Sequence, residues 1–131
     1  MHTYFFIRTD GRFIKVYFKD ILFIEGCKNY VRIYTEEKFF MVLVTMKKME
    51  QALPFNLFCR VHKSYIVAKE KIMGFDSDTI YLKNRELPLG QQFKQSFMNS
   101  VLIIGNNENE ILINTPAIGI ENAINGAVYV A

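Results

Sequence analysis

The sequence predicts an all-β fold with one or two short helices. Of its 131 residues, twelve are Phe and seven are Tyr, and aromatic residues favour strands. Short apolar runs alternate with polar turns at regular spacing, which is typical of an antiparallel meander or a sandwich. Half of the residues are hydrophobic, so the chain can bury a core as one domain and extensive disorder is not expected.

Short strands are expected first, at residues 4–8, 13–18, 20–25, 30–35 and 39–44. The first two flank Asp10 and Gly11, and Asp-Gly between two apolar runs predicts a tight hairpin. The third is expected to end at residue 25, because residues 26–29 (GCKN) interrupt the apolar pattern. A polar turn at residues 36–38 separates the last two strands.

A short amphipathic helix is expected next. Thr45 can serve as its N-cap, Met46 and Met49 recur at helical spacing as core residues, and Pro54 ends it. Further strands are expected at residues 57–61, 65–67, 71–75, 79–82 and 86–89. A second helix is expected at residues 91–99, because Phe93 recurs at helical spacing with later apolar residues. Beyond it we expect a strand (VLII), a turn (GNNEN) and another strand (EILIN).

Charge is distributed unevenly along the chain. Residues 1–100 contain all 16 Lys and Arg and carry a net charge of +6, whereas residues 101–131 carry −3. A basic body is consistent with a polyanionic partner, and equally with ordinary surface charge. No segment resembles a transmembrane helix or a signal peptide, so we expect no membrane association and a cytoplasmic location.

The sequence offers little for catalysis or metal binding. His62 has Lys63 and Ser64 beside it, but no carboxylate lies close to it in sequence to orient it as a general base. Glycine-rich phosphate loops are absent, and Cys27 and Cys59 lack zinc-type spacing. We therefore expect no enzymatic activity, no metal and no cofactor, and two buried reduced thiols.

Polar residues suited to nucleic acid gather in three clusters at loops or at the ends of elements. The clusters are Lys28, Asn29 and Arg32; Arg60, His62 and Lys63; and Gln91, Gln92 and Lys94. Lys and Arg neutralise phosphates or bind guanine, Asn and Gln can pair with an adenine edge, and a helix N-terminus donates N–H groups to phosphate. The alternative interpretation is that each cluster is a solvated loop.

The order of several motifs resembles the LytTR DNA-binding domain of LytR/AlgR-type bacterial response regulators. The motifs are DILFIEGCKNYVRIYT, TMKKMEQALP, FCRVHKSYIV and LPLGQQFKQSF, within residues 4–100. The most specific is RVHKSYIV, which matches the family pattern at every position. The chain is thus expected to contain a DNA-binding domain over residues 1–100 and a C-terminal extension of unknown role over residues 101–131.

The resemblance implies an elongated all-β fold that inserts loops into successive major grooves of direct repeats in double-stranded DNA. It would bring Lys28, Asn29 and Val31 near DNA, then Lys63 with Arg60 or His62, and then the third cluster. His62 has a second reading, as a structural residue hydrogen-bonded to backbone. The implied role is transcription regulation as the output domain of a response regulator in a two-component system.

Two departures from the family pattern bear on this expectation. Gln91 and Gln92 stand where the family often has Arg, which lowers the phosphate contribution and shifts base preference toward adenine. The receiver domain typical of response regulators is missing from this sequence. Control by a histidine kinase is therefore expected only if the chain is part of a longer protein. The rival hypothesis is a protein-interaction module on the same fold, with a homodimer through residues 101–131 as one form.

Overall fold

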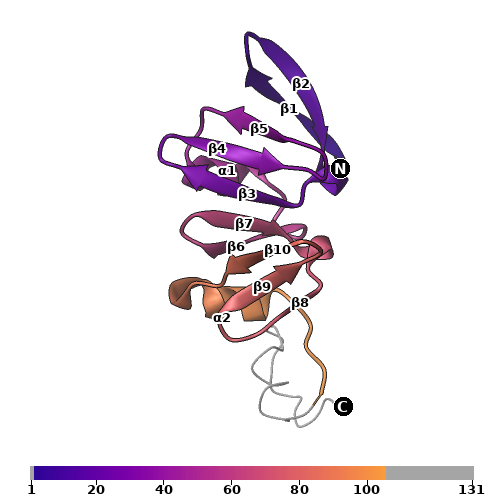
Figure 1. Cartoon of the computed structure of the whole chain (residues 1–131), viewed down its shortest axis with the longest axis vertical. Coiled ribbons are helices and arrows are strands. Elements are labelled where there is room, and N and C mark those ends of the chain that lie inside the picture. The colour runs from indigo at the N-terminus through magenta and orange to yellow at the C-terminus, as the bar shows by residue number, and fades with distance from the viewer. Residues whose placement is uncertain (1, 106–131) are drawn as a thin grey trace. The chain divides into compact units, whose positions relative to one another are not determined.

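The computed structural model describes residues 2–105, which fold into short antiparallel strands and a few helices (Figure 1). The strands are β1 (Tyr4–Thr9), β2 (Arg12–Tyr17), β3 (Phe23–Cys27), β4 (Tyr30–Tyr34), β5 (Phe39–Val42), β6 (Phe58–His62), β7 (Tyr65–Ala68), β8 (Gly74–Phe75), β9 (Thr79–Leu82) and β10 (Arg85–Pro88). The α-helices are α1 (Met46–Ala52) and α2 (Gln91–Asn99), with 3₁₀ turns at Phe18–Asp20 and Lys69–Lys71. The predicted all-β class with one or two short helices is confirmed, and the described residues contain two α-helices.

The chain divides into two compact units, of which the first ends at Gln92 and the second begins at Phe93. The first unit contains all the described strands, in a hairpin of β1 and β2, a three-stranded sheet β10-β9-β8 and a five-stranded sheet β5-β4-β3-β7-β6. In the described part of the second unit, α2 continues to Asn99 with Phe97 fully buried and Phe93 only half-buried.

Strand β3 lies at the centre of the five-stranded sheet and joins two hairpins. It pairs antiparallel with β4 on one side and with β7 on the other, where Glu25 lies opposite Tyr65. Strand β3 therefore runs toward its turn at Lys28, and β7 runs away from its turn at Ser64. The turns of the β3–β4 and β6–β7 hairpins consequently lie at the same end of the sheet (Figure 1).

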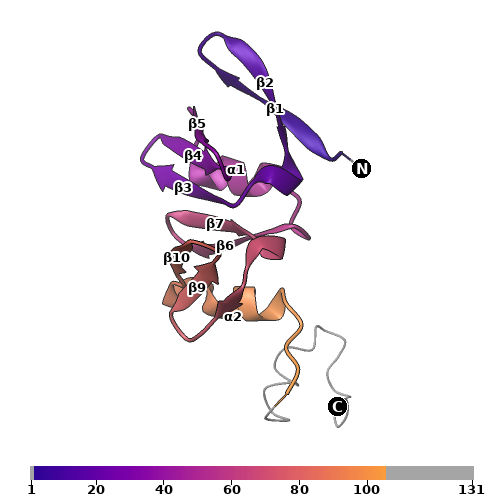
Figure 2. The same cartoon turned by 45° about the vertical axis from the view of Figure 1, so that its right-hand side comes forward.

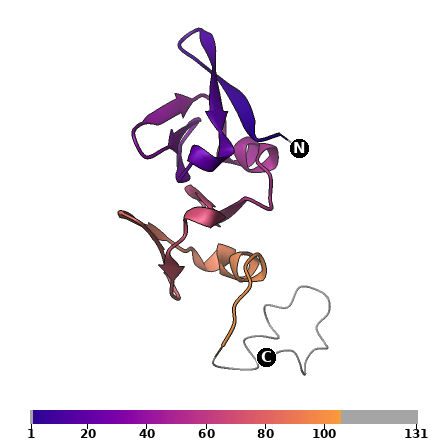
Figure 3. The same cartoon turned by 90° about the vertical axis from the view of Figure 1, so that its right-hand side faces the viewer.

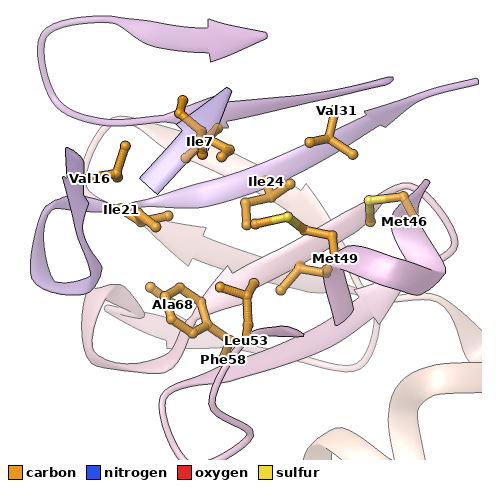
Figure 4. Close-up of a cluster of buried hydrophobic side chains, with 12 residues drawn as sticks. Ile7, Val16, Ile21, Ile24, Val31, Met46, Met49, Leu53, Phe58 and Ala68 are labelled. Atoms are coloured by element: carbon orange, nitrogen blue, oxygen red, sulfur yellow. The ribbon is translucent and has the colours of Figure 1, made fainter. Parts of the chain in front are cut away.

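Helix α1 covers one face of this sheet, as Figures 2 and 3 show. Thr45 caps it, since its hydroxyl accepts a hydrogen bond from the Lys48 N–H at 3.2 Å, and it ends before Pro54 as predicted. Met46 and Met49 are buried against the strand residues Ile24 and Val31 (Figure 4). Because side chains alternate between the two faces of a strand, this packing fixes which residues of β3 and β4 face α1 and which face away from it.

Gly26 lies within β3, so the prediction that the strand ends at residue 25 was wrong. A Cβ at Gly26 would overlap the Met46 Cγ. The glycine is therefore required by the close approach of α1, and not by a turn. The turn follows two residues later, at Lys28 and Asn29. There the chain reverses direction, because Cys27 pairs with Tyr30.

The Asp10-Gly11 turn is confirmed, and both residues have the positive φ angles (52° and 75°) that this kind of two-residue hairpin turn requires. Other boundaries differ from prediction, because short 3₁₀ turns replace the starts of the strands expected at residues 20–25 and 71–75. Residues 101–104 form no strand, and the predicted GNNEN turn and EILIN strand lie outside the described residues. Cys27 and Cys59 are free thiols as expected, but half-buried.

Candidate nucleic-acid interface

The tip of the β3–β4 hairpin presents two polar side chains to solvent. Lys28 and Asn29 form its two-residue turn, and both are exposed. Lys28 has a φ of 62°, in the left-handed region that non-glycine residues rarely occupy. As in the Asp10-Gly11 turn, a positive φ at the first position is what a two-residue hairpin turn requires.

The tip of the β6–β7 hairpin has the same construction. His62 lies opposite Tyr65, and Lys63 and Ser64 form the turn between them, with Lys63 exposed. The polar residues of the RVHKS segment are thus explained by a hairpin end within an otherwise apolar pair of strands.

A backbone hydrogen bond fixes the two tips side by side. The Gly26 N–H donates to the Ser64 carbonyl at 2.8 Å, one step beyond the last β3–β7 residue pair. A strand spacing of about 4.8 Å therefore separates the ends of the two hairpins. Lys28, Asn29 and Lys63 accordingly project from one end of one sheet.

Arg60 holds the second tip from inside the protein. Its Nε donates to the His62 carbonyl at 3.3 Å, and its Nη2 donates to the Lys63 carbonyl at 2.6 Å. Its Nη1 forms an ion pair with Glu50 of α1 at 3.1 Å, and the Arg60 side chain is only 18% exposed. The planar guanidinium thus links the turn to the helix, a role that the sequence did not suggest.

His62 also stabilises the turn. Its Nδ1 accepts a hydrogen bond from the Ser64 N–H at 3.0 Å, which is the structural role considered as one of two readings. Burial, reinforced by the positive charges of Lys63 and Arg60, lowers the pKa of His62 below its ordinary value of 6.5. Only a neutral imidazole can accept this bond at Nδ1. The hydrogen bond and the lowered pKa therefore both favour the neutral form of His62.

Glu25 connects the neighbouring strands just below the tips. Its carboxylate accepts hydrogen bonds from the hydroxyls of Tyr34 and Tyr65, both at 3.1 Å, and from Arg32 at 3.5 Å. Burial, with the nearby Glu25 charge, raises the pKa of Tyr65, so this phenol stays protonated and donating. Sequence reasoning missed this network, and its bond between Glu25 and Tyr65 joins residues that are forty positions apart in the chain.

Two further residues that were expected near DNA, Val31 and Arg32, are not at the tip. Val31 is fully buried in the core beneath α1, so its side chain has no surface with which to contact DNA, and that expectation is corrected. Arg32 is half-buried on the opposite face of the sheet, bonded to Glu25 with its guanidinium 5.4 Å from the Phe39 ring centre. Alternation along β4 accounts for both placements.

The third cluster begins beside the second tip. The Gly90 N–H donates to the Val61 carbonyl at 2.7 Å, which attaches the start of α2 to the strand residue before His62. Gln91 and Gln92 follow at once and are exposed. Lys94 is half-buried and lies on α2, three residues after Gln91.

No group of His, Cys, Asp and Glu in the described residues could hold a metal ion. No helix among them is long and apolar enough to cross a membrane.

Comparison with known families identifies this class of structure. Residues 11–102 match the model of the LytTr DNA-binding domain, so the chain belongs to the LytTR family, whose members are DNA-binding domains. The fold is similar to a solved LytTr DNA-binding domain of a response regulator from Bacillus cereus, with a TM-score of 0.65 and 22% sequence identity. That match covers 76% of this chain and 97% of the other. Comparison with curated proteins gave no significant match.

Proposed function

We propose that this chain binds double-stranded DNA sequence-specifically and regulates transcription. The observation that carries the proposal is the placement of the exposed Lys28, Asn29 and Lys63 on two adjoining turns at one end of a sheet. Gly90 attaches the start of α2, with its two exposed glutamines, to the same end. Membership of a DNA-binding family supports the same conclusion.

The proposed mechanism is insertion of these turns into major grooves. Asn29, Gln91 and Gln92 are suited to the bidentate donor and acceptor pattern of an adenine edge. Lys28 and Lys63 would neutralise phosphates or bind guanine, and each phosphate contact adds roughly one unit to the log-log salt slope. Arg60 and His62 would act by holding the turn in its bound shape, which lowers the ordering cost of binding.

In the wider proposal the chain is the output module of a bacterial response regulator acting in the cytoplasm on direct repeats. Residues 1–100 would suffice for DNA binding, and a homodimer and a receiver domain in a longer protein would provide control. These elements follow from the family resemblance. Comparing DNA affinity of residues 1–100 with that of the full chain tests the first of them.

The test of DNA binding is selection from random duplexes at two salt concentrations, followed by affinity measurement on the enriched sequence. We expect spaced direct repeats that bind more weakly as salt increases. Asn29→Ala and Lys63→Ala should each cost roughly 1–3 kcal/mol of specific affinity where they contact a base. Lys19→Ala is the matched control, because Lys19 is exposed in the 3₁₀ turn that precedes β3, at the opposite end of that strand from Lys28.

Failure to enrich any sequence with a folded protein would overturn the proposal. Equal losses in the Lys63 and Lys19 variants would also contradict it, since the effect would then reflect total charge and not the tips.

A further inference from the structure

The β1–β2 hairpin carries a surface that the DNA interface does not use. Its residues are Tyr4, Phe6 and Arg8 on β1 and Phe13, Lys15 and Tyr17 on β2, and we call this surface the aromatic–cation ladder. The strand register places them in three directly opposed pairs on one face: Tyr4 with Tyr17, Phe6 with Lys15, and Arg8 with Phe13. The labelled hairpin is visible in Figures 1 and 2.

The ladder is solvent-exposed although it is aromatic. Phe6 is 55% and Phe13 67% exposed, and the two tyrosines are close to 40%. The opposite face of the same hairpin is anchored, because Ile7 and Val16 are buried in the core. One face therefore fixes the hairpin to the domain, and the other presents four rings to solvent.

Cations alternate with these rings. The Lys15 Nζ lies 4.4 Å from the centre of the Tyr4 ring and less than 6 Å from those of Phe6 and Tyr17. The Arg8 guanidinium lies 5.6 Å from the centre of the Phe13 ring. No acidic residue belongs to the six, so the face is positive as well as aromatic.

The two most exposed rings, Phe6 and Phe13, occupy one diagonal of neighbouring pairs, and Arg8 and Lys15 occupy the other. Diagonal side chains of this kind lie about 7–8 Å apart at the backbone, within reach of one extended ligand. A second copy of the chain would bring like charges together on such a face. An anionic ligand with planar groups satisfies both the rings and the cations.

We propose that the ladder binds single-stranded nucleic acid, with bases stacked on Phe6 and Phe13 and phosphates paired with Arg8 and Lys15. Exposed aromatic side chains on a sheet, combined with Lys and Arg, bind single strands with little sequence preference. Duplex DNA hides its base faces in the stack, so the ladder is selective for unpaired strands. Strand β1 lies before the matched family residues 11–102, whereas β2 lies within them.

The experiment measures binding of the full chain to labelled deoxythymidine and uridine strands of about 15 nucleotides by fluorescence anisotropy. We expect salt-sensitive binding that falls about five- to one-hundred-fold in each of the single variants Phe6→Ala and Phe13→Ala. A similar loss is expected in Arg8→Ala/Lys15→Ala, with a shallower salt dependence. Phe13→Trp should retain binding, because the indole is also a stacking surface. Comparing the affinities for the deoxythymidine and uridine oligonucleotides shows whether the ladder prefers single-stranded DNA or RNA.

Arg12→Ala is the matched control, since Arg12 is exposed on the same hairpin but pairs with Thr9 on the other face. It should change affinity far less than Arg8→Ala. Absence of wild-type binding to either strand would overturn the proposal, and so would equal losses in the Arg8 and Arg12 variants. Equally tight binding of polyglutamate at the ladder would also overturn it, in favour of an acidic protein partner.

Separate variants test the proposal that the hairpin tips bind duplex DNA and the proposal that the ladder binds single strands. Asn29→Ala and Lys63→Ala should leave single-strand binding unchanged, and the ladder variants should leave the choice of duplex sequence unchanged. Loss of single-strand binding in the tip variants would place the strand at the tips and refute the ladder.

Discussion

Replacing Arg60 tests whether the second hairpin tip is held from within. Arg60→Ala removes two charge-assisted hydrogen bonds to turn carbonyls and one ion pair with Glu50. Bonds from a charged donor contribute roughly 1.5–3 kcal/mol each, and part of this is recovered because carbonyls in an exposed turn can bind water. The ion pair adds roughly 0.5 kcal/mol, because the Glu50 side chain is 47% exposed. We therefore expect a total loss of about 2–3 kcal/mol.

Urea unfolding of three variants separates these contributions. Glu50→Ala removes only the ion pair and should cost no more than about 0.5–1 kcal/mol. Arg60→Lys keeps the charge but cannot form the planar fork, so its stability should lie between those of Glu50→Ala and Arg60→Ala. In the same series, affinity for the selected duplex should fall in both Arg60 variants and stay near wild type in Glu50→Ala. Equal stability of Arg60→Ala and Glu50→Ala would refute the reasoning.

Three further predictions concern single side chains. Lys28→Gly relieves a φ of 62° and should leave stability unchanged or raise it by up to about 1 kcal/mol in urea unfolding, while duplex affinity falls. Because the folded state lowers the pKa of His62, stability should be full above pH 6.5 and decrease as pH falls below it; His62→Gln should flatten this dependence in melts between about pH 7.5 and 5.5. Phe97→Ala should cost about 3–5 kcal/mol because Phe97 is fully buried, and Phe93→Ala should cost less; equal thermal shifts would contradict the burial difference.

The elements that sequence predicted correctly are those whose signals are local. The Asp10-Gly11 turn and the helix between Thr45 and Pro54 each depend on a few neighbouring residues. The helix at Gln91–Asn99 has the predicted bounds, although its buried residue is Phe97 and Phe93 is only half-buried. The helical periodicity located the apolar residues of α2. It could not show which of them is most buried, because burial depends on what packs against each side chain.

The features that were not predicted depend on contacts between distant segments. Gly26 looked like a strand end, but its small size is needed because Met46 of α1 packs over it. Val31 looked like a groove residue from its place in a motif, and alternation along β4 buries it. The pairing of β3 with β7, which brings Lys28 beside Lys63, joins residues about forty positions apart and has no local signature.

We propose that the two hairpin tips and the start of α2 form one DNA-binding surface. The most direct test follows backbone amide NMR shifts of the full chain as the selected duplex is added. We expect the largest changes at residues 28–29, 63–64 and 91–92, with little change at Lys19. Changes that leave the tips unaffected, or that are confined to the β1–β2 hairpin, would contradict it.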